Sequence, residues 1–178
     1  MTDNSLTTLK IRPWSKDDLP LLERLIGDPF MTEHLGGPET LDQIRGRHER
    51  YLTIRDTGTM FVILIGPQST AAGSVGYWER EWQGRTVWEI GWSVLPEFQG
   101  QGIATRATML AVAHARSQSK HQFMHAYPSV DNLPSNAICR KAGFQLQGAS
   151  DFEYPKGHFM RCNDWCLDLL HSSQLPNP

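Results

Sequence analysis

An eleven-residue, glycine-containing segment constrains the fold of this chain more than any other part of it. The segment reads Pro96-Glu97-Phe98-Gln99-Gly100-Gln101-Gly102-Ile103-Ala104-Thr105-Arg106. It follows the β-rich run 87–95 and opens the helical run 103–119. Backbone N–H groups at such a turn lack partners and lie at the positive end of the helix dipole, and glycine allows a ligand to approach closely. The segment therefore predicts an anion site, most simply for the pyrophosphate of a cofactor.

The residues around and after the turn narrow the choice of cofactor. A Walker A loop requires Lys and then Ser or Thr after its last glycine, whereas Ile103 and Ala104 follow Gly102. A dinucleotide fingerprint fits only partly, because Thr105 occupies its third glycine position. Residues 98–130 contain no Asp or Glu that would hold a ribose, and they carry basic residues and three histidines instead. These features favour coenzyme A, a cofactor with an additional phosphate.

Two motifs resemble those of a known family. Gln99-Gly100-Gln101-Gly102-Ile103-Ala104 looks like the Q/R-x-x-G-x-G/A motif of the GNAT superfamily of N-acetyltransferases. Asn132-Leu133-Pro134-Ser135 and Cys139-Arg140-Lys141-Ala142-Gly143-Phe144 are similar to the N-x-x-S…K-x-G-F segment of the branch that contains the ribosomal-protein N-terminal acetyltransferases. Residues 9–14 look like the opening strand of that branch. The motifs follow the family's order and spacing, and the resemblance covers roughly residues 8–170.

The pattern of strands and helices predicts an α/β (α+β) mixed sheet, and the resemblance implies a single-domain, GNAT-like twisted sheet, splayed at the cofactor and flanked by helices. We expect the domain at 8–170, with flexible tails at 1–7 and 171–178. Strands are expected at 8–14, 59–65, 73–81, 86–95, 121–127, 144–147 and 159–169, and helices at 16–26, 39–55, 103–119 and 134–142. Helix 103–119 is expected to bury Ile103, Ala107, Leu110, Ala111 and His114 on one face.

The resemblance implies acetyl-CoA as cosubstrate and direct attack of a primary amine on it in a ternary complex. The matching cofactor-binding residues are Trp92, Val94, Gln99, Gly100, Gln101, Gly102, Ile103, Ala104, Thr105, Asn132 and Ser135. The family stabilises the oxyanion with a backbone N–H that corresponds to Val94, and the same strand edge holds the pantetheine arm through its peptide groups. Asn132 is expected to bond that arm, with an Asx-turn as the alternative.

Glu89 is the best candidate for the base that takes the proton of the amine. It lies five residues before Val94, between apolar neighbours that would raise its pKa. The alternative is a glutamate that faces solvent or pairs with Arg85. His125 and Tyr127 are the reserve candidates, and Glu81 is less favoured because it sits beside the hairpin turn.

The family motif does not supply the acid that protonates the departing thiolate, because the chain departs from the family here. Much of the superfamily has a Tyr four residues before the glycine of G-F, and this chain has Cys139 there. A thiol can donate a proton, but a small core residue fits equally well. Ser135 is the preferred acid, with a helix cap or a structural hydroxyl as its alternative, and solvent can also protonate the thiolate.

Composition limits the other functions. The chain has 178 residues, 39% of them hydrophobic, and a net charge of −2, which favours neither nucleic acid nor anionic membrane as a partner. It has no apolar run of membrane length and a polar N-terminus, and three cysteines fit a reducing cytoplasm. Cys162, Cys166 and His158 offer only one loose pair of ligands, so we expect free thiols and no metal site.

The acceptor is expected to be a small-molecule or peptide amine, selected by residues 31–38, 77–82 and 152–159. The chain is expected to be a monomer or a homodimer. One alternative is a non-catalytic acyl-CoA-binding module of the same fold, which the missing Tyr favours. A remote alternative is a nucleotide-dependent oxidoreductase, based on the partial match at Gly100-Gln101-Gly102.

Overall fold

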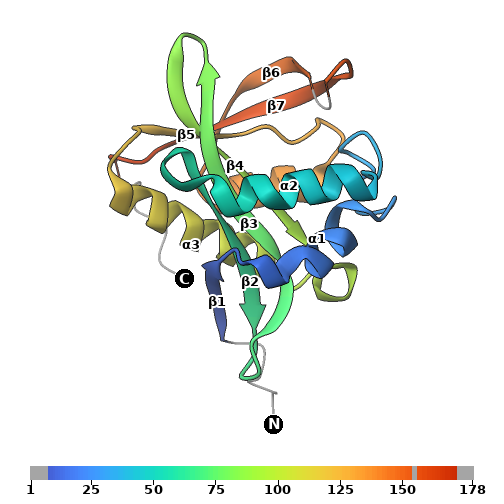
Figure 1. Ribbon diagram of the computed structural model, residues 1–178. Coiled ribbons are helices and arrows are strands. Elements are labelled where there is room, and N and C mark those ends of the chain that lie inside the picture. Colours follow the sequence, from blue (N-terminus) through green and yellow to red (C-terminus); the bar gives the residue numbers. More distant parts are fainter. Residues whose placement is uncertain (1–7, 154–155, 172–178) are drawn as a thin grey trace.

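A computed structural model describes residues 8–153 and 156–171 of the chain, so most of both expected tails lies outside the described residues. The described part forms a seven-stranded sheet with the order β1-β2-β3-β4-β5-β7-β6 (Figure 1). The strands are β1 (Leu9–Pro13), β2 (Gly58–Ile65), β3 (Thr70–Trp82), β4 (Arg85–Val94), β5 (Phe123–Ala126), β6 (Gln145–Glu153) and β7 (Phe159–Asp168). The α-helices are α1 (Leu19–Ile26), α2 (Leu41–Thr53), α3 (Ile103–Gln118) and α4 (Leu133–Lys141), and short 3-10 turns span Lys16–Asp18, Arg55–Thr57 and Pro96–Phe98.

The sheet is antiparallel except between β4 and β5, which are joined by the crossover helix α3. Within the described residues, these two strands pair at only two positions, Trp88 with Met124 and Glu89 with His125. Beyond Glu89 the ladder between them stops, although β4 continues to Val94. The expected mixed sheet, open beside the strand that precedes the glycine turn, is therefore confirmed.

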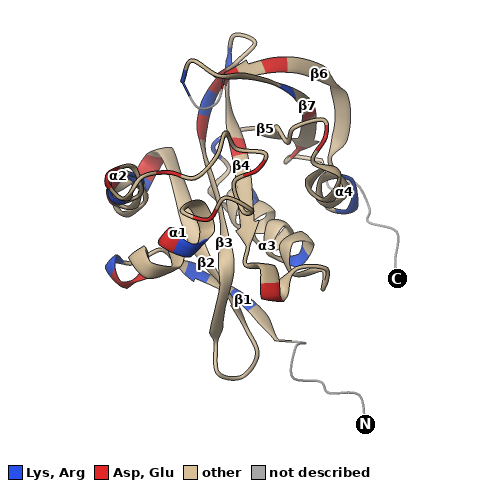
Figure 2. Ribbon diagram, turned by 90° about the vertical axis from the view of Figure 1, so that its right-hand side faces the viewer, with Lys and Arg blue, Asp and Glu red and all other residues tan. Residues whose placement is uncertain are grey.

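Helices cover both faces of the sheet. Figure 2 shows α1 and α2 on one side and α3 and α4 on the other. Side chains alternate between the two faces along a strand, so β4 sends Trp88, Ile90 and Val94 into the core beneath α3. A second core lies beneath α1 and α2 and contains Leu22 and Leu25. The Glu89 side chain points to the α1–α2 face, because side chains alternate along β4 and those of Trp88 and Ile90 point to the other face.

Local sequence signals explain most of the element boundaries. Gln83 and Gly84 both have positive φ, 49° and 78°, and form the two-residue turn between Trp82 and Arg85, as expected. Strand β6 extends to Glu153, further than the expected end at 147, and its register shifts at Gly148, where φ is 151°. Its sequence is mostly polar and exposed, so hydrophobic alternation does not reveal the second half of the strand.

The expected buried face of helix 103–119 is wrong at one residue. Leu110 is 40% exposed, although it was expected in the core. The buried stripe of α3 runs instead through Ala107, Ala111 and Ala115, with Thr108 and Val112 beside them, so Leu110 lies beyond its edge. No helix in residues 8–153 and 156–171 has the length and apolar character needed to span a bilayer.

Candidate functional site

The glycine turn leaves a cluster of backbone N–H groups at the start of α3. Gly100 and Gly102 both have φ of 73°, a left-handed conformation that glycine adopts without strain. The helix ladder begins with Arg106 N–H bonded to Gly102 O, so the N–H groups of residues 103–105 precede it. The first turn of α3 has no acidic residue, and a Cβ on either glycine would meet no atom within 4 Å. The turn is therefore open and suited to a bound anion.

The peptide group of Val94 faces the side where β4 and β5 diverge. Leu95 N–H donates to Ala72 O at 2.9 Å. Hydrogen-bonded and non-hydrogen-bonded residue pairs alternate along an antiparallel ladder, so the next pair, Val94 and Gly73, is not hydrogen-bonded. The N–H and C=O of Val94 consequently point away from β3. The C=O already accepts from Gln99 Nε2 at 2.8 Å, which ties the glycine turn to the end of β4.

Glu89 is partly buried at the last paired position between β4 and β5, and its side chain is 14% exposed. Its partner is Arg80 of β3, whose Nη1 lies 2.9 Å from Glu89 Oε2, and not the Arg85 considered from the sequence. Burial raises the pKa of the Glu89 carboxyl, although the positive charge of Arg80 opposes the shift. The Arg80 guanidinium in turn lies 4.0 Å from the centre of the Phe152 ring.

His125 and Asp164 form a second buried pair beside Glu89. His125 Nδ1 and Asp164 Oδ1 are 2.6 Å apart, and Trp82 Nε1 donates to Asp164 Oδ2 at 3.1 Å. Tyr127 stacks on the His125 ring, and its hydroxyl is buried without a hydrogen-bond partner in the described part of the chain. Burial, followed by the nearby Asp164 and Glu89 carboxylates, raises the pKa of Tyr127 far above its ordinary value.

Asn132 and Ser135 begin helix α4. Asn132 Oδ1 accepts from Ser135 N–H at 3.1 Å, so its side chain caps the helix. This helix cap differs from the Asx-turn that was the alternative for Asn132, and it occupies the side-chain oxygen. The Ser135 side chain is half-buried at this helix start.

Cys139 lies in the core and not at the protein surface. It is 0% exposed, belongs to the core beneath α3, and burial raises its pKa to about 12. This geometry favours the core-residue interpretation over the acid. Cys162 and Cys166 are also free, and the described residues contain no group of His, Cys, Asp or Glu arranged to hold a metal ion.

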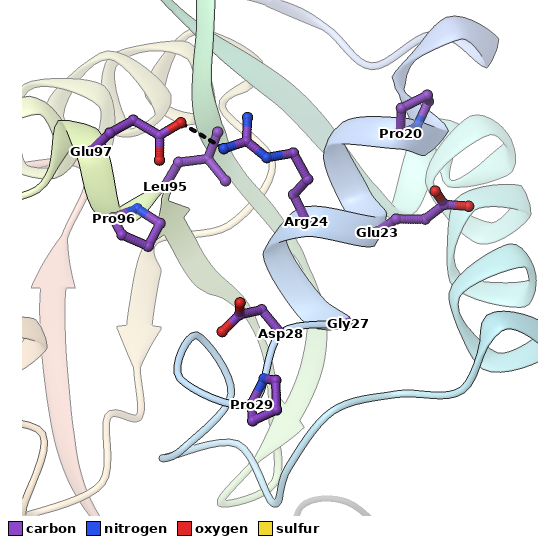
Figure 3. A pocket seen from close by; sticks show the side chains of 9 residues that line it. All are labelled: Pro20, Glu23, Arg24, Gly27, Asp28, Pro29, Leu95, Pro96 and Glu97. Carbon is purple, nitrogen blue, oxygen red and sulfur yellow. Dashed lines mark hydrogen bonds and ion pairs between the residues drawn. The ribbon is translucent and has the colours of Figure 1, made fainter.

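A cavity of about 440 Å³ opens beside the end of β4 (Figure 3). Its walls come from α1, the start of the following loop and the turn after β4, and the residues that line it are Pro20, Glu23, Arg24, Gly27, Asp28, Pro29, Leu95, Pro96 and Glu97. Arg24 Nη2 pairs with Glu97 Oε1 at 2.6 Å across this cavity. The loop from α1 also reaches the glycine turn, because Gln99 Nε2 lies 3.6 Å from Met31 Sδ.

Comparison with known proteins decides the family. The family model of the acetyltransferase (GNAT) domain matches residues 8–145 of this chain. The chain belongs to the GNAT acetyltransferase family. The assignment inferred from the two motifs is thereby confirmed, and the oxyanion, base and cofactor roles of single residues stay predictions.

Individual relatives are distant in sequence and close in fold. The uncharacterized N-acetyltransferase YnaD of Bacillus subtilis (strain 168) is 23% identical over 110 residues, which cover 62% of this chain and 61% of YnaD. The Salmonella typhimurium acetyltransferase that modifies the N-terminal serine of ribosomal protein L7/L12 superposes with a TM-score of 0.75 at 22% identity, covering 91% of this chain and 95% of that one. Spermidine N-acetyltransferase of Vibrio cholerae, in complex with CoA and spermine, gives 0.76 at 18% identity, covering 93% and 99%. These structures show a shared fold.

Three residues of this region were not predicted from the sequence: Arg80, Asp164 and Asn136. Arg80 shares a sheet face with Trp78 and Trp82, so alternation along β3 was the available signal. Asp164 gave no local signal, because its partner His125 lies 39 residues away in the sequence. Asn136 lies in α4 and is only 7% exposed, although a polar residue in a short helix is expected to face solvent.

Proposed function

We propose that this protein is an acetyl-CoA-dependent N-acetyltransferase that transfers the acetyl group directly to a primary amine in a ternary complex. Membership of the family supports the acetyl transfer and the cosubstrate. The single observation that carries the proposal in this chain is the open turn at Gly100 and Gly102, placed where β4 and β5 separate. Its free N–H groups suit the pyrophosphate of coenzyme A, with Gln99 to Thr105 around it.

The proposed chemistry begins at Val94. The amine nitrogen attacks the thioester carbonyl, the C–N bond forms, and negative charge develops on the carbonyl oxygen. The outward N–H of Val94 is the donor for this oxygen, because it points into the gap beside β4 and takes no part in the ladder with β3. The peptide groups from Trp92 to Val94 are the proposed contacts of the pantetheine arm.

Two proton transfers complete the reaction. Glu89 accepts the proton that the amine loses, through water where the acceptor does not reach it, and burial makes this carboxylate a stronger base than an exposed one. The C–S bond then breaks, and the thiolate takes a proton from Ser135 or from solvent. Cys139 has no role in the proposed reaction, because its side chain is 0% exposed.

The acceptor is proposed to enter from the α1–α2 side. The cavity beside Leu95 opens there, and Glu89 faces the same side of the sheet. One relative modifies a protein N-terminal serine and another acetylates spermidine, which supports an amine acceptor for this chain.

The first test compares two glycine variants by calorimetric titration with acetyl-CoA. Gly102→Glu places a carboxylate among the N–H groups of the turn and is expected to abolish binding. Gly84→Glu is the matched control, since Gly84 has φ of 78° and an equally open Cβ position, but lies at the β3–β4 hairpin. Both variants carry the same backbone strain and charge change. A folded Gly102→Glu protein that binds acetyl-CoA normally would refute the site.

Activity is measured separately as thiol release with two amines, a peptide that begins with serine and spermidine. NAD and ATP serve as binding controls for the nucleotide alternative. Binding of NAD in place of acetyl-CoA would overturn the proposed cosubstrate.

A further inference from the structure

Arg80 and Glu89 are diagonal neighbours on one face of the sheet. Trp78 of β3 pairs directly with Glu89 of β4, and Arg80 lies two residues further along β3, so its side chain points to the same face. Diagonal neighbours across two antiparallel strands are roughly 7–8 Å apart, a separation that long side chains span. Arg80 Nη1 accordingly lies 2.9 Å from Glu89 Oε2. The register of the β3–β4 hairpin therefore brings a cation to the proposed base.

Three aromatic rings lie around the Arg80 guanidinium. Its central carbon is 4.0 Å from the centre of the Phe152 ring, 5.4 Å from that of Tyr127 and 5.9 Å from that of Trp82. A guanidinium stacks favourably on aromatic faces. Arg80 Nε is buried and has no hydrogen-bond partner in the part of the chain that the structure describes. Ring packing, together with the bond to Glu89, therefore fixes the orientation of this guanidinium.

The rings around Arg80 come from different parts of the sheet. Trp82 ends β3, Tyr127 follows β5, and Phe152 lies near the end of β6. Trp82 Nε1 also donates to Asp164 Oδ2 of β7 at 3.1 Å, so the β3–β4 hairpin contacts the β6–β7 hairpin at a second point. Both hairpins stand at the same end of the sheet (Figure 1). Arg80 therefore connects the carboxylate on β4 to the hairpin that follows α4.

Several titratable groups influence the Glu89 carboxylate. Burial raises its pKa, and the charge of Arg80 is the largest influence that opposes this shift. His125, paired with Glu89 across β4 and β5, also favours the charged carboxylate when it is protonated. The titratable groups around Glu89 are Arg80 of β3, His125 of β5, Tyr127 after β5, and Cys162 and Asp164 of β7.

We propose that Arg80 is a positioning residue for Glu89 and that the Phe152 ring holds Arg80 in place. Arg80 fixes Oε2 of the carboxylate and so directs the group that takes the proton of the amine. The proton passes from the amine nitrogen to a Glu89 oxygen, and Arg80 keeps its own proton throughout. This role rests on the proposed function, because Glu89 acts on an amine only if the protein transfers an acetyl group.

Two Arg80 variants separate charge from orientation in the pH profile of kcat/KM for thiol release. Arg80→Met removes the cation that opposes desolvation, so the rising limb of the profile should move up by about one pH unit. Arg80→Lys keeps the charge and loses the planar fork. Its limb should stay in place while kcat falls about tenfold, because the carboxylate is less well oriented. A limb that does not move in Arg80→Met would overturn the role.

Arg161→Met is the matched control. Arg161 is an exposed arginine of β7 that pairs with the exposed Asp151 at 3.2 Å, so the same charge and a similar ion pair are lost away from Glu89. Its profile should match that of the unaltered protein. An equal shift in Arg161→Met and Arg80→Met would reduce the effect to net charge and overturn the positioning role.

A double-mutant cycle tests the part of Phe152. Phe152→Leu removes the ring beneath the guanidinium and should move the rising limb in the same direction as Arg80→Met, by less. In the Arg80→Met background it should move the limb no further, because Phe152 then has no cation to hold. Shifts that add in the double variant would overturn the assignment of Phe152.

The Glu89 titration is also followed by ¹³C NMR of the side-chain carboxyl carbons, assigned by comparison with Glu89→Gln, which needs no acceptor amine. A higher midpoint in Arg80→Met without transfer to any amine would refute the proposed function while Arg80 still controls Glu89. Normal transfer, with profile and midpoint unchanged in Arg80→Met, would overturn the positioning role and leave the proposed function intact. Arg80→Lys and Phe152→Leu supply the same measurements if Arg80→Met does not fold.

Discussion

Two opposing influences act on the pKa of Glu89. It is partly buried at the point where β4 and β5 stop pairing, and this desolvation raises its pKa, whereas its ion pair with Arg80 at 2.9 Å favours the charged form. The raised pKa means that desolvation outweighs the ion pair. A base of this kind is protonated at a higher pH than an ordinary carboxylate, so its proton equilibrium falls nearer to the working pH.

Replacing Glu89 tests its role as the base. Glu89→Gln is expected to lower kcat by about a hundredfold, the lower range for loss of a general base. In the unaltered protein the rate should rise with pH as the carboxyl loses its proton, at a pH above the ordinary range for glutamate, and Glu89→Gln should lose this rise. Acetyl-CoA affinity should stay within about twofold, because Glu89 lies away from the glycine turn proposed to bind the pyrophosphate.

The control for that experiment is Glu81→Gln. Glu81 is an exposed carboxylate on β3 that accepts from the Thr86 hydroxyl, so the charge change is the same and the location differs. It should reproduce the unaltered pH profile. An unaltered profile in Glu89→Gln would instead assign the base elsewhere, with His125 as the next candidate.

Cys139 is expected to matter for stability and not for chemistry. Cys139→Ala removes a fully buried sulfur, and the free energy of unfolding should fall by about 1–2 kcal/mol, less than for loss of a larger side chain. Turnover per folded molecule should stay unchanged. Stability is measured by urea unfolding, and a tenfold drop in turnover at full folding would return the acid role to Cys139.

At the scale of elements, the Asn136 side chain of helix α4 forms four hydrogen bonds that connect it to its surroundings. Asn136 Nδ2 donates to Ser129 O and Asn132 O, at 2.9 and 2.8 Å. Its Oδ1 accepts from Asn163 Nδ2 and Trp165 Nε1, at 2.7 and 2.8 Å. This amide therefore connects the loop after β5, the start of α4 and strand β7. The position of Ser135 depends on these bonds.

Two alanine variants of α4 should separate capping from this connection. Asn132→Ala removes a helix cap and should cost about 1 kcal/mol of unfolding free energy. Asn136→Ala leaves several buried groups without partners and should cost more, roughly 2–4 kcal/mol. Urea unfolding of both proteins gives the comparison. Equal losses would mean that the Asn136 bonds are readily replaced by water.

At the scale of the whole molecule, two cores share one sheet, and an ion pair with a buried carboxylate joins its first strand to the 3-10 turn before the first helix. Asp18 is 5% exposed and accepts from Arg12 Nη1 and Nη2 at 2.8 and 2.6 Å and from Ser15 N–H at 2.7 Å. Burial alone would raise the pKa of Asp18, but these hydrogen bonds outweigh it and the pKa is lowered. The pair lies at the edge of the core beneath α1 and α2.

The lowered pKa predicts the sign of the pH dependence. Stabilisation by Asp18 is present above the ordinary carboxyl pKa, roughly 4, and is lost as the pH falls through the lower value of the folded state. Asp18→Asn should therefore reduce the free energy of unfolding by about 1–3 kcal/mol at neutral pH, and by less in acid. Asp17→Asn, an exposed neighbour, is the control and should change little. A loss for Asp18→Asn that does not change with pH would contradict this explanation.

Much of the fold was predictable because its signals are local. The glycine turn, the β3–β4 hairpin at Gln83 and Gly84, and the strand before the turn depend on neighbouring residues, and each lies where it was expected. Leu110 was misplaced, because the buried stripe of α3 is set by the sheet beneath it. The second half of β6 was missed because its partner strand, not its own pattern, keeps it extended.

The sequence by itself determined the family and the place of the glycine turn, since both depend on residues that are adjacent along the chain. Only the tertiary structure decided the environment of the side chains. It pairs Glu89 with Arg80, places His125 within hydrogen-bonding distance of Asp164, and buries Cys139. These relations depend on strand order and register, which bring distant residues together, and burial there raises the pKa of Glu89 and of Cys139.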